Sequence, residues 1–327
     1  MSALGKQTSG VIDVLVAAWN RADTIERAIR SALGEPEVDK VIVVDDASTD
    51  DTGRRAERLG AETNRVVVHR LQSNGGPSIA RNKALELSSA PWVAILDGDD
   101  FFLPGRMGKL LSVADGFDFV ADDVLQIEEA LVGKSEPMAV LGEAVLGPSR
   151  LDFKTFVLGN VSRRSAHRRE LGFLKPLVRR AFLDRHRLRY EVALRLGEDY
   201  AFYARSLALG ALFLITPAYG YVSVARSNSL SGRHSKDDLE RLRDIDLKLG
   251  VMANLSGEEE RALRVHYRSV DAKVQWLAVI AAFKSRCFTR LAAPFFRSPE
   301  VSLFLALKLV EEARNRSGKL LMRRGLS

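Results

Sequence analysis

The chain has 327 residues, of which 46% are hydrophobic and 28% are charged, so it holds enough apolar material for a core and is not disordered throughout. Its single cysteine excludes an intramolecular disulfide framework and a cysteine-based zinc site. The net charge of +7 favours an anionic partner, for which nucleic acid, an acidic membrane and a phosphate-bearing substrate are the candidates.

The sequence shows no segment that would carry the chain into or across a membrane. The first ten residues lack the basic and apolar regions of a signal peptide. The longest apolar runs, such as Trp276–Phe283, are shorter than the ~18 residues that a spanning helix needs. We therefore expect a cytoplasmic protein that is soluble or lies on a membrane surface.

The first hundred residues alternate between strand and helix patterns. Short apolar runs rich in β-branched residues predict buried strands at 11–18, 40–44, 66–71 and 92–96. Helical patterns lie between them, at 25–33, from 48 onward and at 78–87. The alternation predicts an α/β fold with a mostly parallel central sheet and flanking helices. Parallel strands end at one edge of such a sheet, and ligands bind there.

Acidic clusters follow two of these predicted strands, at Asp45-Asp46 and at Asp97–Asp100. Carboxylate oxygens suit Mg²⁺ or Mn²⁺ rather than zinc, and such a cation shares its coordination with phosphates and water. Both clusters also have a structural alternative, because Asp and Gly are ordinary turn residues and Ser48 is a good helix cap.

Arg81 lies on the predicted helix after the turn at 74–76, where it could reach the same edge as a phosphate or base contact. The alternative is a solvated surface arginine. No glycine follows the first strand, where residues 17–21 read AAWNR, and no Walker A loop occurs. A nucleotide site here would therefore be built from carboxylates and a metal, without a glycine cradle.

Five segments occur in the order and at the spacing of a known family. They are Val14–Leu33, Val41–Thr52 (VIVVDDASTDDT), Asn74–Asn82 (NGGPSIARN), Leu96–Asp100 (LDGDD) and Gly197–Tyr200 (GEDY). Together they resemble the inverting family 2 glycosyltransferases. The resemblance implies a Rossmann-like GT-A domain over 1–235, with a nucleotide-sugar half at about 10–105 and an acceptor half at about 150–235. A C-terminal helical extension then covers 236–327.

Four further segments are similar to bacterial exopolysaccharide glucosyltransferases of the succinoglycan type, at 159–164, 171–183, 196–203 and 226–232. This resemblance implies an inverting, metal-dependent transfer of glucose from UDP-glucose. The implied acceptor is a polyprenyl-diphosphate-linked saccharide, the product bond is β, and the implied location is peripheral, on the cytoplasmic face of the inner membrane.

The resemblance also implies roles for individual residues. Asp199 is the general base, beside Glu198. Asp97 and Asp99 form the DxD motif that binds the diphosphate and the divalent cation, Mg²⁺ or Mn²⁺. The residues implied in binding the nucleotide sugar are Ala18, Asn20, Asp45, Asp46, Arg81, Asp97, Gly98, Asp99 and Arg226.

Two of these assignments leave alternatives open. Glu198-Asp199 could instead be an acidic pair at a helix N-terminus, facing the helix dipole. Asn228 stands where relatives often place a histidine metal ligand, so His234 is a candidate substitute. A lone loop histidine is more commonly just exposed.

Two basic regions admit two interpretations each. Residues 163–189 contain ten Lys or Arg and two acids. They could border a diphosphate-lipid acceptor and an anionic membrane, or form a solvated face paired with acids elsewhere. The apolar stripe beyond 276, with five basic residues after 313, could be an interfacial element or a packing face.

Three alternative functions remain at this point. A same-fold transferase could use another donor, such as UDP-galactose or UDP-N-acetylglucosamine. A basic nucleic-acid-binding module is disfavoured, because the basic stretch lacks interleaved aromatic residues and carboxylates line the sheet edge. An inactive scaffold is disfavoured because all the key carboxylates are present.

Overall fold

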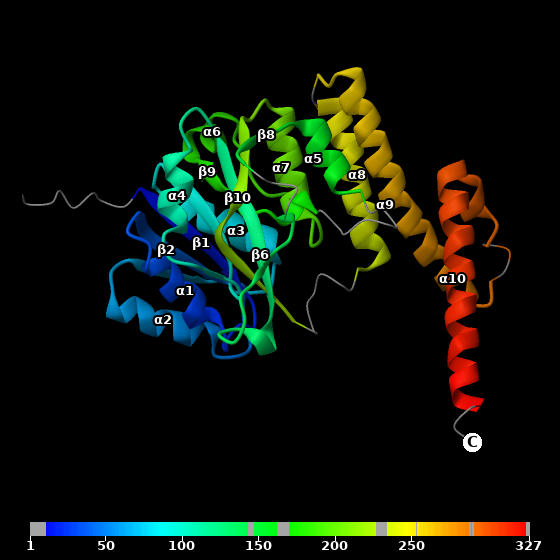
Figure 1. Ribbon diagram of the computed structural model, residues 1–327, viewed down its shortest axis with the longest axis horizontal. Helices are drawn as coiled ribbons and strands as arrows, with labels where there is room; N and C mark the ends of the chain where they lie inside the picture. The colour runs from blue at the N-terminus through cyan, green and yellow to red at the C-terminus, as the bar shows by residue number, and fades with distance from the viewer. Residues whose placement is uncertain are drawn as a thin grey trace, which may run out of the picture. The chain divides into compact units, whose positions relative to one another are not determined.

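The computed structural model describes residues 11–142, 147–161, 170–226, 234–252, 254–287, 289 and 291–324. The chain divides into two compact units, Met1–Gly232 and Arg233–Ser327 (Figure 1). Each unit has its own elements and its own packing, and the two are described in turn.

The first unit is built on one large sheet. Its strands in the described residues are β1 (Ile12–Ala18), β2 (Val38–Asp45), β3 (Val66–Arg70), β4 (Trp92–Asp97), β5 (Phe101–Phe102), β6 (Phe119–Glu128), β7 (Met138–Ala139), β8 (Ser149–Leu151), β9 (Leu177–Arg179) and β10 (Phe213–Ala225). Its helices are α1 (Ile25–Leu33), α2 (Thr52–Glu62), α3 (Pro77–Leu87), α4 (Arg106–Ser112), α5 (Phe153–Gly159), α6 (Arg180–Arg185) and α7 (Glu198–Ala208), with short 3₁₀ turns η1 (Glu129–Leu131) and η3 (Leu171–Phe173).

The strand order along the sheet is β3-β2-β1-β4-β9-β6-β10-β5. The first four strands in this order are parallel to one another, as are β6 and β10. Strand β9 runs antiparallel to both of its neighbours, β4 and β6. The predicted mostly parallel α/β sheet with flanking helices is thus confirmed.

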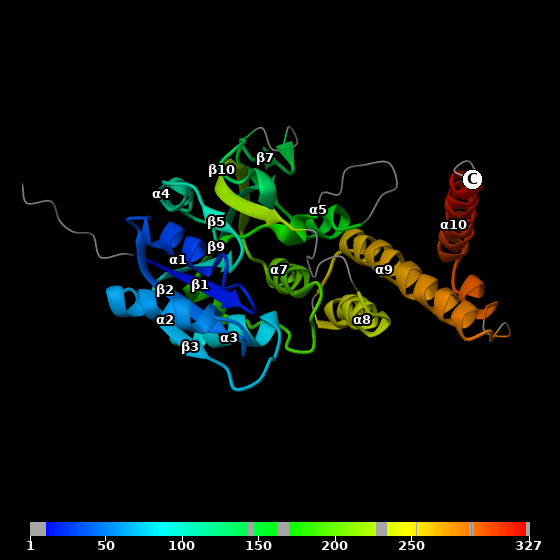
Figure 2. The ribbon, with the colours of Figure 1, turned by 90° about the horizontal axis from the view of Figure 1, so that it is seen from below.

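The order of the first four strands positions the site. The chain runs outward from β1 to β2 and β3, then returns to β4 on the other side of β1. Right-handed crossovers place α1 and α2 on one face and α3 on the other, and Figure 2 shows α1 and α3 on opposite sides of β1. The direction of winding reverses between β1 and β4, and open α/β sheets bind ligands outside such a reversal point.

The sheet is buried on both faces, which explains why its parallel strands read as continuous apolar runs. Alternate residues of β1 and β2, such as Val14, Val16 and Val41, join a core cluster with Ile25 and Ile29 of α1. Helix α3 contacts β1 and β2 from the other side. The β-branched pattern of the sequence therefore reflects two-sided packing.

The second unit is helical in its described residues. Its elements are α8 (Lys236–Met252), α9 (Gly257–Lys284), the 3₁₀ turn η6 (Ala293–Phe296) and α10 (Pro299–Arg324). Helix α9 begins at a capping box in which Ser256 and Glu259 bond each other's backbone. It contacts α8 and α10, and Val279 of α9 packs with Val301 and Leu305 of α10.

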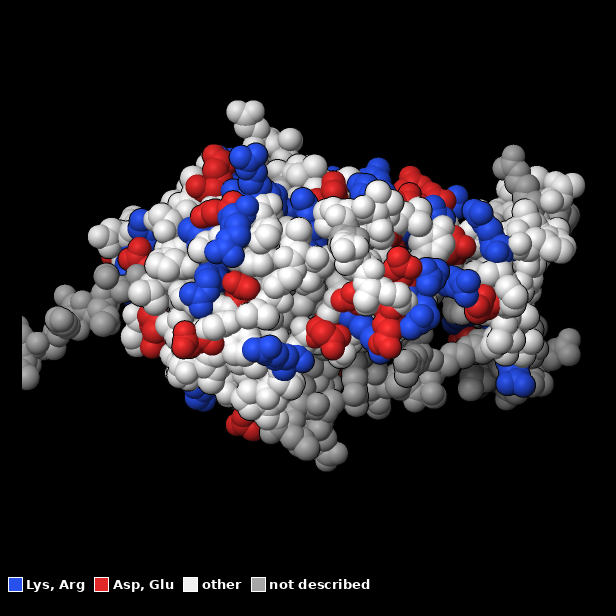
Figure 3. All heavy atoms as spheres, turned by 90° about the horizontal axis from the view of Figure 1, so that it is seen from above, with Lys and Arg blue, Asp and Glu red and all other residues white. Residues whose placement is uncertain are grey.

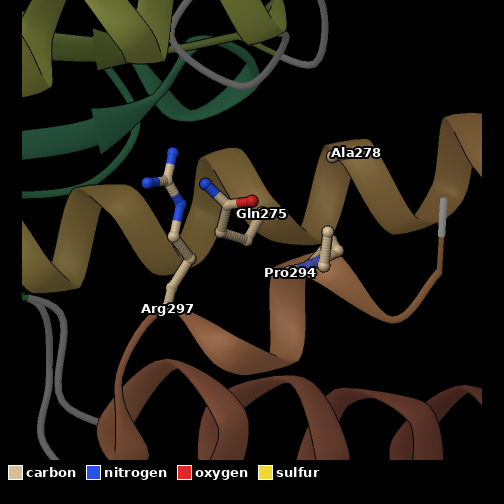
Figure 4. A pocket seen from close by; sticks show the side chains of 5 residues that line it. Gln275, Ala278, Pro294 and Arg297 are labelled. Carbon is tan, nitrogen blue, oxygen red and sulfur yellow. The ribbon is translucent and has the colours of Figure 1, made fainter.

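A hollow of about 410 Å³ lies in the second unit, between α9 and the segment around η6 (Figure 4). It is lined by Gln275, Ala278, Ala293, Pro294 and Arg297. In the part of the chain that the structure describes, no helix has the length and apolar content needed to cross a bilayer.

Candidate active site

The predicted acidic clusters lie at the same edge of the sheet. Ala18, the last residue of β1, pairs in register with Asp45 of β2, and Ala17 pairs with Asp97 of β4. Asp45 and Asp97 are therefore two strands apart, which corresponds to about 10 Å. The carboxyl ends of β1, β2 and β4 thus bring residues of three distant segments together.

Asp46 holds the turn that precedes α3. Its carboxylate accepts hydrogen bonds from the backbone N–H of Gly75 (2.7 Å) and Gly76 (2.8 Å) and from the side chain of Asn74 (2.9 Å). Its own N–H donates to the carbonyl of Ala18 at 2.8 Å. Asp46 therefore links the segments that follow β1, β2 and β3, and these linked segments form one wall of the site.

Asp45 is fully buried beneath that wall. Its Oδ1 accepts a hydrogen bond from the N–H of Ser48 at 2.9 Å, and its Oδ2 lies 3.4 Å from Nε of Arg70. A Cβ added at Gly53 would lie only 2.6 Å from Oδ2, so this glycine makes room for the carboxylate. The interpretation of Ser48 as a helix cap is wrong, because α2 begins at Thr52 with Asp51 as its N-cap residue, and Ser48 instead bonds Asp45 and Asn20.

Asn20 connects the loops that follow β1 and β2. Its N–H donates to Oγ of Ser48 and its Oδ1 accepts from the N–H of Thr49, both at 2.9 Å. Its φ of 52° is in the left-handed region, which asparagine tolerates better than most residues. Asn20 therefore shapes the floor beside Ala18.

Gly98 allows β4 to end against this floor. A Cβ at this position would lie 3.2 Å from Cβ of Ala18, tighter than ordinary packing. Asp99 follows at the rim, with Oδ2 3.0 Å from Nε of Arg21 and its carbonyl accepting from Arg27 at 2.7 Å. The close approach of two backbones explains the glycine between the two aspartates.

Arg81 is buried and bridges carboxylates from two parts of the chain. One guanidinium nitrogen lies 2.7 Å from Oδ1 of Asp97. The other lies 2.8 Å from Oε1 of Glu198 and 3.1 Å from Oδ1 of Asp199. The solvated-surface interpretation of Arg81 is wrong, because the side chain is 4% exposed and holds three acids.

Lys175 makes a second bridge between the same aspartates. Its Nζ lies 2.6 Å from Oδ2 of Asp199 and 3.0 Å from Oδ2 of Asp97. Sequence reasoning missed this role and counted Lys175 only among the basic residues of 163–189. Strand β9 explains the position: it pairs antiparallel with β4, so the chain just before Leu177 runs beside the carboxyl end of β4.

The positive charges of Arg81 and Lys175 influence which of the neighbouring acids are ionised. Burial opposes ionisation of Asp97, but the charges of Lys175 and Arg81 outweigh it and hold the pKa of Asp97 well below its usual range. Burial would lower the pKa of Lys175, but Asp199 and Asp97 raise it above its ordinary value. Burial raises the pKa of Glu198, against the lowering effect of Arg81. Lys175 and Asp97 are therefore a charged pair at neutral pH.

Asp100 differs from its neighbours Asp97 and Asp99. It is buried, accepts hydrogen bonds from the hydroxyl of Tyr221 (2.7 Å) and the N–H of Val224 (2.9 Å), and points away from the rim. Burial, followed by the nearby charges of Asp97 and Asp99, raises the pKa of Asp100 to about 8. This residue ties the end of β4 to β10.

The two remaining assigned residues belong to different units, Arg226 to the first and His234 to the second. Burial, followed by the charge of Arg226, lowers the pKa of Arg27, whose guanidinium donates to the carbonyl of Asp99, so Arg226 lies near this rim. Arg226 follows β10, and its guanidinium lies 2.7 Å from Oε1 of Glu129. His234 belongs to the second unit, just before α8. Asn228 lies outside the described residues. Among the described residues, no three His, Cys, Asp or Glu side chains gather in a geometry that would hold a metal.

The basic stretch does not form one face in its described part. Lys175 serves the acidic cluster, Arg179 stacks 4.4 Å over the ring of Trp92, and Arg180 donates to the carbonyl of Ala90. Residues 162–169 lie outside the described residues. On the surface shown in Figure 3, acidic and basic side chains are interspersed.

Comparisons with known proteins point to one family. A family model described as "Glycosyl transferase family 2" matches residues 13–165. The chain is 47% identical over 257 residues to the succinoglycan biosynthesis protein ExoU of Rhizobium meliloti (strain 1021), covering 79% of this chain and 74% of ExoU. It is 33% identical over 291 residues to ExoO of the same organism, covering 87% and 82%.

A shorter match is to WfaP of Escherichia coli, named as a UDP-Glc:alpha-D-GlcNAc-diphosphoundecaprenol beta-1,3-glucosyltransferase. It is 31% identical over 100 residues, covering 30% of this chain and 39% of WfaP. Among solved structures, S. aureus TarS 1–349 in complex with UDP-GlcNAc has a TM-score of 0.61 at 20% identity, covering 77% of this chain and 70% of TarS.

The mannosyltransferase PcManGT from Pyrobaculum calidifontis, in complex with GDP-Man and Mn²⁺, has a TM-score of 0.57 at 15% identity, covering 92% of this chain and 79% of PcManGT. At such identities the two structures show the fold alone, which is the expected GT-A fold. The family model and the long matches to ExoU and ExoO show more than the fold. The chain belongs to glycosyl transferase family 2.

Proposed function

We propose that this protein is an inverting glucosyltransferase of exopolysaccharide synthesis, of the succinoglycan kind. It transfers glucose from UDP-glucose to a polyprenyl-diphosphate-linked saccharide and forms a β-glycosidic bond. The proposal is supported by the similarity to ExoU and ExoO and by the name of WfaP, which specifies both a UDP-Glc donor and a diphosphoundecaprenol-linked acceptor. The observation that carries it is that Arg81 and Lys175 each contact both Asp97 and Asp199, at the point where the winding of the sheet reverses.

The donor would lie along the edge formed by β2, β1 and β4. The wall built by Asp45 and Asp46 and the floor at Ala18 and Asn20 would receive the uridine. The diphosphate would then lie at the end of β4, beside Asp97 and Asp99. Ionic contacts from a buried arginine are stronger than in water, so Arg81 suits the phosphate end of the site.

Asp199 would accept the proton of the acceptor hydroxyl as that oxygen attacks the anomeric carbon. This is general base catalysis, which contributes typically about 10²–10⁴-fold to the rate. A single displacement with one base and no covalent nucleophile inverts the anomeric configuration, so an α-linked donor leads to a β-linked product. Arg81 would move little, since its partners on β4 and α7 hold its guanidinium group.

The residues at the end of β4 fit a hard divalent cation by the chemistry of their oxygen donors. Asp99 and Asp97 would hold Mg²⁺ or Mn²⁺, and the cation would stabilise the negative charge on the departing UDP. Both oxygens of Asp97 contact Arg81 and Lys175, so Asp97 would give up one of these contacts to become a ligand.

A panel of nucleotide sugars tests both donor and cation. UDP-glucose with Mn²⁺ is expected to raise the thermal unfolding midpoint, because a ligand that binds only the folded state stabilises it. EDTA is expected to remove most of this effect and to stop transfer of labelled glucose to lipid extracts. A larger shift with UDP-galactose or UDP-N-acetylglucosamine would identify a different donor, and an equal shift in EDTA would refute the cation site.

The second unit supplies the proposed membrane contact. Val301 and Leu305 of α10 pack inward, whereas Leu303, Leu307 and Val310 are exposed on the opposite side of the helix. Residues 313–327 then carry five basic residues and no acid. An exposed apolar stripe followed by basic residues suits an anionic bilayer, at about 1 kcal/mol per basic residue near the surface.

Co-sedimentation with vesicles tests this contact. The full chain is expected to bind vesicles in proportion to their anionic lipid, and the double variant Leu303→Gln/Leu307→Gln is expected to bind several-fold less. The matched control is Leu247→Gln/Val251→Gln, which changes two exposed apolar residues of α8 instead. Binding that is independent of anionic lipid, or equal loss in both double variants, would refute the proposed surface.

A further inference from the structure

Lys175 is a buried lysine to which the family resemblance assigns no role. It is 5% exposed, and its ammonium group contacts Asp97 and Asp199 on different elements of the sheet edge. Its backbone is fixed as well, because its carbonyl accepts a hydrogen bond of 2.7 Å from Arg106. Arg106 is itself fully buried and paired with Asp122. The lysine is therefore held in place from both ends.

Joining the two halves of the site does not require this lysine. Arg81 already bridges Asp97 and Asp199 from α3. Arg81 alone faces three acids, so Lys175 supplies a second positive charge that balances the buried carboxylates. Charge balance alone does not require the ammonium group to contact Asp199 at the oxygen that Arg81 leaves free.

The arrangement of oxygens shows what the second cation adds. Asp199 contacts Arg81 through Oδ1 and Lys175 through Oδ2. Asp97 likewise contacts Arg81 through its Oδ1 and Lys175 through its Oδ2. A carboxylate held at one oxygen still rotates about its side-chain bonds. Held at both oxygens, it has one orientation, and a base fixed in orientation needs no reorganisation when the hydroxyl arrives.

We propose that Lys175 is a positioning residue that fixes the carboxylate of Asp199 for proton transfer from the acceptor. This inference rests on the proposed function, in which Asp199 is the base. It assigns Lys175 to the chemical step and not to donor binding. Arg81 and the wall around Asp46 keep the donor side in place without it.

The variant Lys175→Met tests the assignment, because methionine has a similar length and no charge. We expect kcat for glucose transfer to fall at least tenfold, while KM for UDP-glucose stays within threefold of the wild-type value. The matched control is Lys109→Met, which removes an exposed lysine on α4 and is expected to leave both constants unchanged. An unchanged kcat in folded Lys175→Met would overturn the proposal.

A second comparison covers the outcome in which Lys175→Met does not fold. The double variant Lys175→Met/Asp199→Asn removes one positive and one negative charge together, and its affinity for UDP with Mn²⁺ is compared with that of Asp199→Asn by calorimetry. We expect the two affinities to agree within threefold. A tenfold weaker affinity in the double variant would make Lys175 a donor ligand and overturn the proposal. Failure of the wild-type protein to transfer glucose would instead refute the proposed function.

Discussion

The variant Asp199→Asn is expected to lose sugar transfer while it still binds UDP. Asparagine has nearly the same shape as aspartate, but its amide cannot take a proton from an attacking hydroxyl. The expected loss in kcat is about 10²–10⁴-fold, the contribution of a positioned general base. The measurement is single-turnover transfer from labelled UDP-glucose, with UDP affinity measured by calorimetry on the same preparation.

A matched control keeps this result specific. Asp152 is the N-cap of α5, where its carboxylate accepts a hydrogen bond from the N–H of Thr155. Asparagine is an equally good N-cap, so Asp152→Asn is expected to leave transfer unchanged. If Asp199→Asn kept more than about a tenth of the wild-type kcat, Asp199 would lose the role of base.

We expect the largest loss of stability from Arg106→Met, which removes a buried positive charge that contacts the backbone of Lys175. Arg106 is fully buried, and its Nε and one terminal nitrogen contact Oδ1 of Asp122 at 2.9 and 2.6 Å. Oδ2 of Asp122 accepts hydrogen bonds from the N–H groups of Tyr219 and Gly220 in β10. Removing the arginine would leave a buried carboxylate without its counter-charge, at a cost of about 3–5 kcal/mol.

Urea unfolding followed by circular dichroism measures this cost. The double variant Arg106→Met/Asp122→Asn removes both charges, so it is expected to be more stable than Arg106→Met alone. A loss of less than about 1 kcal/mol in the single variant would show that the pair is not a major support of the fold. Equal stability of the single and double variants would show that the unpaired carboxylate is not the cause.

The parallel part of the sheet could be predicted because its cause is local. Two-sided burial leaves a mostly apolar run in β1, β2 and β4, and each run ends close to the polar residues of the site. Asp45, Asp46 and Asp97 therefore had a predictable place at the strand ends. Their common edge follows from right-handed crossovers alone.

The partners of these residues could not be predicted in the same way. Arg81 was expected near the edge, but nothing in its helix indicates that it holds Glu198 and Asp199. Lys175 depends on β9, a strand of three residues whose antiparallel pairing with β4 leaves no periodic pattern. A lysine between Leu174 and Pro176 in an otherwise apolar run was the available signal.

The basic stretch illustrates the limit of charge counting. Its excess positive charge indicated a surface patch, but Lys175 and Arg179 turn inward to specific partners. The net charge of a segment does not tell which of its basic side chains pair with buried acids or stack on aromatic rings. Only the fold decides that distribution.

A crystal structure of the protein soaked with UDP and Mn²⁺ would test the central claim most directly. The account predicts uridine against the wall of Asp45 and Asp46, the cation on Asp99 beside the diphosphate, and the carboxylate of Asp199 facing the space for the sugar. UDP bound elsewhere on the chain, or a cation held without Asp97 or Asp99, would contradict it.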